Sequence, residues 1–176
     1  VSDGNGGFDS STLQVSITPV NDAPVDGDEA ASTNEDTVLT GNVLANATDV
    51  DSPILTVTQF QLAGNPTVYA AGATATIAGV GSLTIGATGA YSFTPAANYA
   101  GAVPAATYTV SDGNGGFDTS TLQVSITAVN DAPVDGDETV STNEDTTVSG
   151  NVLDNATDVD GDTLQVTQFQ VAGSST

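Results

Sequence analysis

The sequence repeats itself, and this repeat constrains the fold more than any other feature. Residues 1–67 align without a gap to residues 110–176, and 52 of these 67 positions are identical. The period of about 109 residues is the size of one small domain and exceeds the 20–50 residues of a solenoid unit. We therefore expect the end of one module in residues 1–20, a complete module in residues 21–129 and the beginning of a third in residues 130–176.

Alternating apolar and polar residues predict an all-β fold. Leu122, Val124 and Ile126 alternate with polar residues in one run, so their side chains share a face of a strand. The same alternation marks residues 55–60, 82–85, 90–94 and 108–110. Roughly seven short strands in one module fit an antiparallel, Ig-like β-sandwich. The expected core combines small aliphatic residues with Phe60, Tyr91, Phe93, Tyr108 and Phe117.

The charge of the chain excludes several classes of partner. There are 22 Asp and Glu residues but no Lys, Arg or His, so the net charge is −22. Such a chain cannot neutralise phosphates, so we expect no nucleic-acid partner, and anionic membrane surfaces repel it. No apolar run approaches the roughly 18 residues of a membrane span. Residue 1 already lies in a patterned strand, so we expect an internal part of a larger protein, without a signal peptide in these residues.

The same composition argues against catalysis. Without His, Cys, Lys or Arg there is no usual nucleophile–base pair and no cationic group to stabilise a transition state. Paired carboxylates could hydrolyse glycosides, but their recurrence in every repeat favours an architectural role. A ligand-binding or carbohydrate-binding module remains an alternative, although the absence of Trp makes a stacking platform for sugars doubtful. A subunit of an extracellular fibre is a further alternative.

The acidic residues gather in short clusters, and none lies between Ile54 and Val110. Two unit charges about 4 Å apart repel by roughly 1 kcal/mol in water and about 4 kcal/mol at an effective dielectric of 20. If the fold brings the clusters together, something must offset this repulsion. Ligands that offer only oxygen select a hard cation, and calcium accepts six to eight oxygens in flexible geometry. The clusters are Asn21-Asp22-Ala23-Pro24, Asn34-Glu35-Asp36, Asp49-Val50-Asp51 and Asp112-Gly113-Asn114, each with a copy.

These motifs resemble those of cadherin repeats. Residues 128–133, Ala-Val-Asn-Asp-Ala-Pro, look like the cadherin linker Asp-x-Asn-Asp-x-Pro, and residues 47–51 look like its Ala-x-Asp-x-Asp element. Asn34-Glu35 and the Asp-Gly of residues 112–113 also have cadherin counterparts. The whole pattern is most similar to the bacterial cadherin-like and Ig-like tandem repeats of giant surface adhesins. The resemblance covers the chain outside about residues 64–105.

The resemblance implies calcium at the joint between consecutive modules. The first joint would use the Asn21 carbonyl with Asp22, Asp49, Asp51 and Asp112. The second would use Glu35, Asn130, Asp131, Asp158 and Asp160, with Asp162 as an additional member and Glu144 as the copy of Glu35. Two departures reduce the expected number of ions. The first linker Asp is replaced by Pro19 and Ala128, and Asn98 stands near the place of the missing Asp-Arg-Glu element.

The implied function is a calcium-stiffened spacer of an extracellular adhesin, exported by type I secretion, that supports adhesion and biofilm formation. Its partners would be neighbouring repeats of the same chain, with identical chains in a fibre as a second possibility. Dissociation constants of about 10⁻⁴–10⁻³ M are typical of extracellular calcium modules.

Plainer interpretations stay open for the candidate ligands. Asp49 and Asp51 could form a solvated turn, Asn130-Asp131 a simple linker, Asp112 a hairpin turn and Glu35 a strand bend. We interpret the run Asp26, Asp28, Glu29 as a solvated face, and Asp-Gly-Asn-Gly-Gly as a turn rather than a β-roll calcium repeat.

Overall fold

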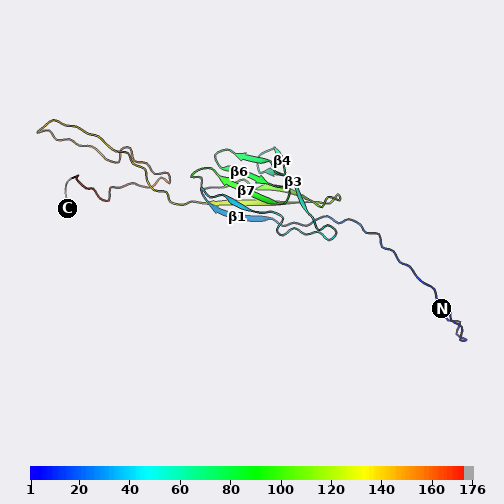
Figure 1. Cartoon of the computed structure of the whole chain (residues 1–176). Coiled ribbons are helices and arrows are strands. Elements are labelled where there is room, and N and C mark those ends of the chain that lie inside the picture. The colour runs from blue at the N-terminus through cyan, green and yellow to red at the C-terminus, as the bar shows by residue number, and fades with distance from the viewer. Residues whose placement is uncertain (173–176) are drawn as a thin grey trace.

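The computed structural model describes residues 1–172, whose strands form a two-sheet β-sandwich without a helix in that range (Figure 1). No helix long and apolar enough to cross a membrane is therefore found among these residues. The five-stranded sheet has the order β1 (Glu29–Asn34), β9 (Phe117–Thr127), β8 (Ala106–Ser111), β3 (Thr56–Leu62), β4 (Val68–Ala70). The four-stranded sheet has the order β2 (Leu39–Asn42), β7 (Ala90–Pro95), β6 (Gly81–Ile85), β5 (Thr74–Ile77). The expected all-β class is confirmed, and residues 173–176 of the predicted third module lie outside the described residues.

Strand β1 determines where the chain enters the sandwich. It pairs in parallel with β9, from Glu29 opposite Leu122 to Asn34 opposite Thr127, whereas the other named strand pairs are antiparallel. Because β1 is the first strand and β9 the last, the chain enters at one end of the sandwich and leaves at the other. Figure 1 shows residues 1–20 and 130–172 extending from these opposite ends.

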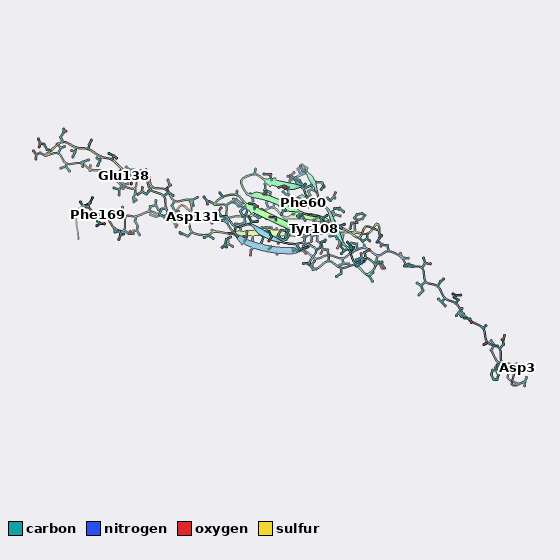
Figure 2. All side chains as sticks on the ribbon, viewed as in Figure 1. Asp3, Phe60, Tyr108, Asp131, Glu138 and Phe169 are labelled. Carbon is teal, nitrogen blue, oxygen red and sulfur yellow. The ribbon has the colours of Figure 1, made fainter. Side chains whose placement is uncertain are left out.

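The core lies between the two sheets and contains most of the predicted residues. Phe60, Phe93 and Tyr108 are at most 1% exposed, and Leu122, Val124 and Ile126 are buried along one face of β9. Figure 2 shows Phe60 and Tyr108 inside the sandwich. Phe117 was wrongly assigned to the core, since it is 59% exposed. Side chains alternate along a strand, and an odd-numbered position of β9 faces away from the core.

The two segments outside the sandwich lack the strands that their sequences form within it. Residues 10–18 repeat residues 119–127 of β9 with one difference, yet residues 10–18 contain no strand, and Leu13 and Ile17 are 86% and 89% exposed. Strand β9 lies between β1 and β8, and no such neighbours flank residues 10–18 in the described chain. A strand is stable only with partners, so the same residues behave differently in the two places.

Candidate metal centre

Each copy of the Asn-Asp-Ala-Pro motif, residues 21–24 and 130–133, forms a connector at one end of the sandwich. At the N-terminal end, the first connector docks onto loops of the module that follows it. The Asn21 side-chain amide donates a hydrogen bond to Asp112 Oδ2 (2.6 Å), and the Asp22 backbone N–H donates to Asp51 Oδ2 (2.8 Å). Pro24 is buried, and the neighbouring Val25 forms a backbone bridge. The connector is thus held by side chains from the β2–β3 and β8–β9 loops.

Asp49 shapes the first of these loops and leaves one oxygen without a partner. Its Oδ1 accepts hydrogen bonds from the backbone N–H groups of Asp51 (2.8 Å) and Ser52 (2.6 Å). Its Oδ2 is buried, and no hydrogen-bond donor of the described residues reaches it. Buried carboxylate oxygens normally accept a hydrogen bond or bind a cation, so this oxygen is a candidate ligand atom.

Asp112 organises the second loop and is itself buried. Its Oδ1 accepts the backbone N–H groups of Asn114 (2.7 Å) and Gly116 (2.9 Å). The Asn21 amide and these backbone donors lower the pKa of the Asp112 carboxyl, so it is held as a carboxylate. Asp3 forms the same turn in the preceding copy of the motif, with both acceptor distances at 2.8 Å. The turn predicted from the sequence is therefore confirmed and is encoded locally.

At the C-terminal end, three carboxylates converge. Glu35, Asp36 and Asp131 each contribute one carboxylate oxygen, and these three oxygens all lie within 4.8 Å of one another. Glu35 is only 6% exposed, and its Oε1 accepts the backbone N–H of Val129 (2.6 Å). Asp36 has a left-handed backbone (φ 56°), and its Oδ1 accepts the N–H of Asn98 (3.0 Å). The β1–β2 turn thus carries two carboxylates that face Asp131 of the second connector, and the loop after β7 fixes the orientation of one of them.

Asp131 is the centre of this group and lies where the chain leaves the sandwich (Figure 2). Its backbone N–H donates to Asp160 Oδ2 (2.7 Å), repeating the Asp22–Asp51 contact of the other end. Burial raises the pKa of the Asp131 carboxyl, and the charges of Asp160, Glu35, Asp36 and Asp158 raise it further. Asp131 Oδ2 is buried, and no donor from residues 1–172 reaches it. Acidic groups from both sides of the connector therefore raise the pKa of this one carboxyl.

Comparison with models of known protein families shows which family this chain belongs to. Residues 21–128 match the bacterial cadherin-like domain. The chain belongs to this family. Residues 130–176 match the bacterial Ig domain. Bacterial cadherin-like and Ig-like domains are generally non-enzymatic structural domains of extracellular or surface proteins, and cadherin-like domains typically bind calcium.

The other comparisons add little to the cadherin-like assignment. No curated protein is similar enough in sequence to match the chain. One similar solved structure is a nucleoside hydrolase-related hypothetical protein from Saccharophagus degradans that is associated with carbohydrate metabolism. The TM-score is 0.43 at 14% identity, over 61% of this chain and 26% of that chain. The cadherin-like chain thus spans about a quarter of the length of that protein.

The cadherin-like module brings most predicted ligands together at its two ends. Asn21, Asp22, Asp49, Asp51 and Asp112 gather at the N-terminal end. Glu35, Asp131, Asp158 and Asp160 gather at the C-terminal end, where the Asn130 side chain donates to the Asp131 carbonyl (2.7 Å). Whether these residues bind metal remains a prediction.

Two predicted ligands lie apart from these groups, and one group member was missed. Asp162 reaches the cluster only through its backbone N–H, which donates to Asp158 Oδ1 (3.3 Å). Glu144 is exposed, and its carboxylate has no hydrogen bond to any described residue. Asp36 was not predicted as a ligand, although it directly follows Glu35 in the repeated Asn-Glu-Asp motif, which was the available signal.

The interpretation of Asp26, Asp28 and Glu29 as a solvated face is wrong for two of the three residues. Asp26 and Glu29 are half-buried, and both side chains contact the hydroxyl of Tyr108. Asp28 is exposed, and its Oδ1 accepts the backbone N–H of Thr121 (2.8 Å). Glu29 begins β1, whose alternation turns its side chain toward the sandwich. Asp26 precedes this strand and is held against β8 and β9 by its hydrogen bonds with Tyr108 and Asp118.

Proposed function

We propose that the chain is a spacer segment of a bacterial surface adhesin, in which calcium at each junction holds successive modules in line. The observation that supports this proposal is the convergence at the C-terminal junction. Glu35 and Asp36 belong to the complete module, whereas Asp131 and Asp160 belong to the connector and the segment that follows. An ion that binds both sets joins the two sides of the connector.

The donors at the junctions fit calcium rather than a softer metal. Every candidate ligand atom is a carboxylate, amide or backbone oxygen, which is the ligand set of a hard cation. Buried oxygens that no described residue donates to occur at both ends, on Asp49 and on Asp131. The chain contains no Lys, Arg or His that could neutralise them. Calcium would supply the missing positive charge at both junctions.

The residues of the junction prepare the connector for this role. Glu35 accepts the N–H of Val129, the residue directly before the connector, and Asp160 accepts the N–H of Asp131 within it. The Asn98 amide fixes the orientation of Asp36. The connector backbone is thus held from both sides, while unneutralised carboxylates repel one another and favour bending. Neutralisation would convert this hinge into a stiff joint.

A row of such joints would form a rod that carries a distal binding domain away from the cell. The partners of each module are then the neighbouring modules of the same chain, and the site of action is the cell surface after export. We extend the proposal to adhesion and biofilm formation, and to type I secretion as the export route, because these belong to the adhesins whose repeats share these motifs.

Glu35 and Glu144 offer a matched test. They occupy the same position of the repeat, but Glu35 belongs to the carboxylate cluster with Asp36 and Asp131, whereas Glu144 is exposed and belongs to no such cluster among the described residues. We expect Glu35→Gln to weaken calcium binding several-fold in titration calorimetry of the full chain, and Glu144→Gln to leave it unchanged. Small-angle scattering should give a larger maximum dimension in calcium than in chelator for the unmodified chain, with a smaller difference for Glu35→Gln.

Two results would contradict the proposal. One is a scattering profile that is identical in calcium and in chelator. The other is equal calcium affinity in the Glu35→Gln and Glu144→Gln variants, since the ion would then bind away from the junction.

A further inference from the structure

The base of the module is the segment of residues 26–29, where the chain enters the sandwich. A buried tyrosine hydroxyl beside this segment faces more hydrogen-bond acceptors than it has protons to donate. Tyr108 is 0% exposed, and its hydroxyl oxygen lies 2.8 Å from Asp26 Oδ2 and 3.0 Å from the Val43 carbonyl oxygen. It also contacts Glu29 Oε2. A hydroxyl has one proton to donate, so it cannot satisfy two ionised carboxylates at once.

No cationic side chain is available to neutralise the two carboxylates. The chain has no Lys, Arg or His. The ionisable groups facing the pair from the neighbouring elements are Asp28 on its own segment, Asp118 of β9, Tyr91 of β7 and Tyr108 of β8. Asp118 Oδ2 accepts the backbone N–H of Asp26 (2.8 Å), which brings a further negative charge close. Glu29 Oε1 is buried and has no donor among the described residues.

We propose that Asp26 and Glu29 share one proton through Tyr108, and that this proton holds the base of the module against β8 and β9. We call this arrangement the proton lock. The Glu29 carboxyl O–H donates to the Tyr108 hydroxyl oxygen, and the Tyr108 O–H donates to Asp26 Oδ2. This arrangement uses each proton once and leaves the pair with a single negative charge. When both carboxyls ionise, one of them loses its donor and the two charges repel.

The direction of the pKa shifts agrees with the shared proton. Burial raises the pKa of both carboxyls, against the lowering effect of nearby hydrogen-bond donors, chiefly Tyr108. The charges of Asp118 and Asp28 raise the pKa of Asp26 further, and those of Asp26 and Asp28 raise the pKa of Glu29. Burial also raises the pKa of Tyr108, so its hydroxyl keeps its proton. A carboxyl whose pKa is raised by folding stabilises the fold at pH below its ordinary value, 3.8 for Asp and 4.5 for Glu. This stability is lost as the pH rises through the raised pKa.

Acid should strengthen the proton lock, whereas it should weaken calcium binding at a junction. Carboxylates release calcium when they are protonated, whereas the Asp26–Glu29 pair is tightest with a proton bound. Asp26 lies two residues after Pro24 of the connector, so the pair fastens the beginning of the module to β8 and β9. The module would then stay folded under the mildly acidic conditions that loosen its joints. The proton lock itself does not depend on the proposed calcium sites.

The test uses the full chain in chelator. Carboxyl-carbon NMR should show that Asp26 or Glu29 titrates above its ordinary pKa. The melting temperature should fall as the pH rises through that midpoint. Glu29→Gln keeps an N–H donor toward Tyr108 at every pH and should remove this fall. Asp28→Asn, which removes a charge from the same segment but keeps an acceptor for Thr121, should retain it.

Several outcomes would overturn the shared proton. One is ordinary titration of both carboxyls by NMR, a measurement that does not require any variant to fold. Another is a Glu29→Gln melting curve that follows the unmodified chain at every pH. A third is neutralisation of the pair only when calcium replaces chelator, because a metal ion would then take the place of the proton.

Discussion

Replacement of Tyr108 by Phe removes a single buried oxygen, and the structure allows the loss to be estimated. A hydrogen bond to a charged group contributes about 1.5–3 kcal/mol, and the hydroxyl lies against two carboxyl groups and the Val43 carbonyl. Asp26 and Glu29 are only half-buried, so water can replace part of the lost contact. We therefore expect the free energy of unfolding to fall by about 2 kcal/mol for Tyr108→Phe. For a domain of this size the melting temperature should drop by roughly 8–16 °C.

Tyr91 provides the matched control. It is also buried, at 8% exposed, but its hydroxyl makes no hydrogen bond to the described residues. Tyr91→Phe should therefore change the free energy of unfolding by no more than about 0.5 kcal/mol. Urea denaturation followed by circular dichroism at mildly acidic pH, in chelator, measures both variants. If Tyr108→Phe and Tyr91→Phe were equally stable, the hydroxyl of Tyr108 would not hold the base of the module.

Three further results are expected. Phe93 is fully buried, so Phe93→Ala should lower the free energy of unfolding in urea by about 3–5 kcal/mol, whereas the exposed Phe117 should tolerate Ala with a much smaller loss; equal losses would contradict the assignment of the core. In Gly116→Ala the new methyl group would lie 2.3 Å from Asp112 Oδ2 and 2.9 Å from Ala23 Cα, so the connector should detach and become more sensitive to protease; unchanged digestion would show that the connector is not docked there. Folding lowers the pKa of the Asp112 carboxyl, so this residue stabilises the fold above its ordinary pKa of 3.8, and the stabilisation is lost as the pH falls through the lowered pKa. Asp112→Asn should therefore flatten the acid side of the plot of melting temperature against pH in chelator, and an unaltered plot would refute this.

The strands that the sequence predicted are those in which apolar and polar side chains alternate, including short ones such as residues 82–85 and 108–110, which lie in β6 and β8. Residues 55–60 alternate and, apart from Leu55, lie in β3; residues 121–127 alternate and lie in β9. Strand β1 was not predicted, because Ala30, Ala31 and Ser32 show no such alternation. Its parallel pairing with β9 joins residues more than 90 positions apart, and no local pattern specifies such a contact.

The junction residues were predictable because the repeat marks them twice. Asp49 and Asp51 recur as Asp158 and Asp160, and both copies form the same turn. The burial of Asp26 and Glu29 was not predictable, since it depends on Tyr108, about 80 residues away in sequence. An acidic run at the beginning of a strand looks solvated until its facing strand is known.

The nearly identical segments 10–18 and 119–127 show the limit of local reasoning. Both have the alternation of a strand, but only residues 119–127 lie between two other strands. The Asp-Gly-Asn-Gly-Gly turns form in both copies, because Asp3 and Asp112 supply their hydrogen bonds from within the turn. Turns are therefore encoded by the local sequence here, whereas strands also require their neighbours.

The parallel pairing of β1 and β9 determines how the module responds to pulling. Tension along a row of modules enters at the start of β1 and leaves at the end of β9, so it acts lengthwise on the ladder that joins these two strands. The six residue pairs of that ladder, from Glu29–Leu122 to Asn34–Thr127, are loaded in shear and must break together rather than unzip one at a time. A tether exposed to fluid drag would gain its mechanical strength from this one pair of strands.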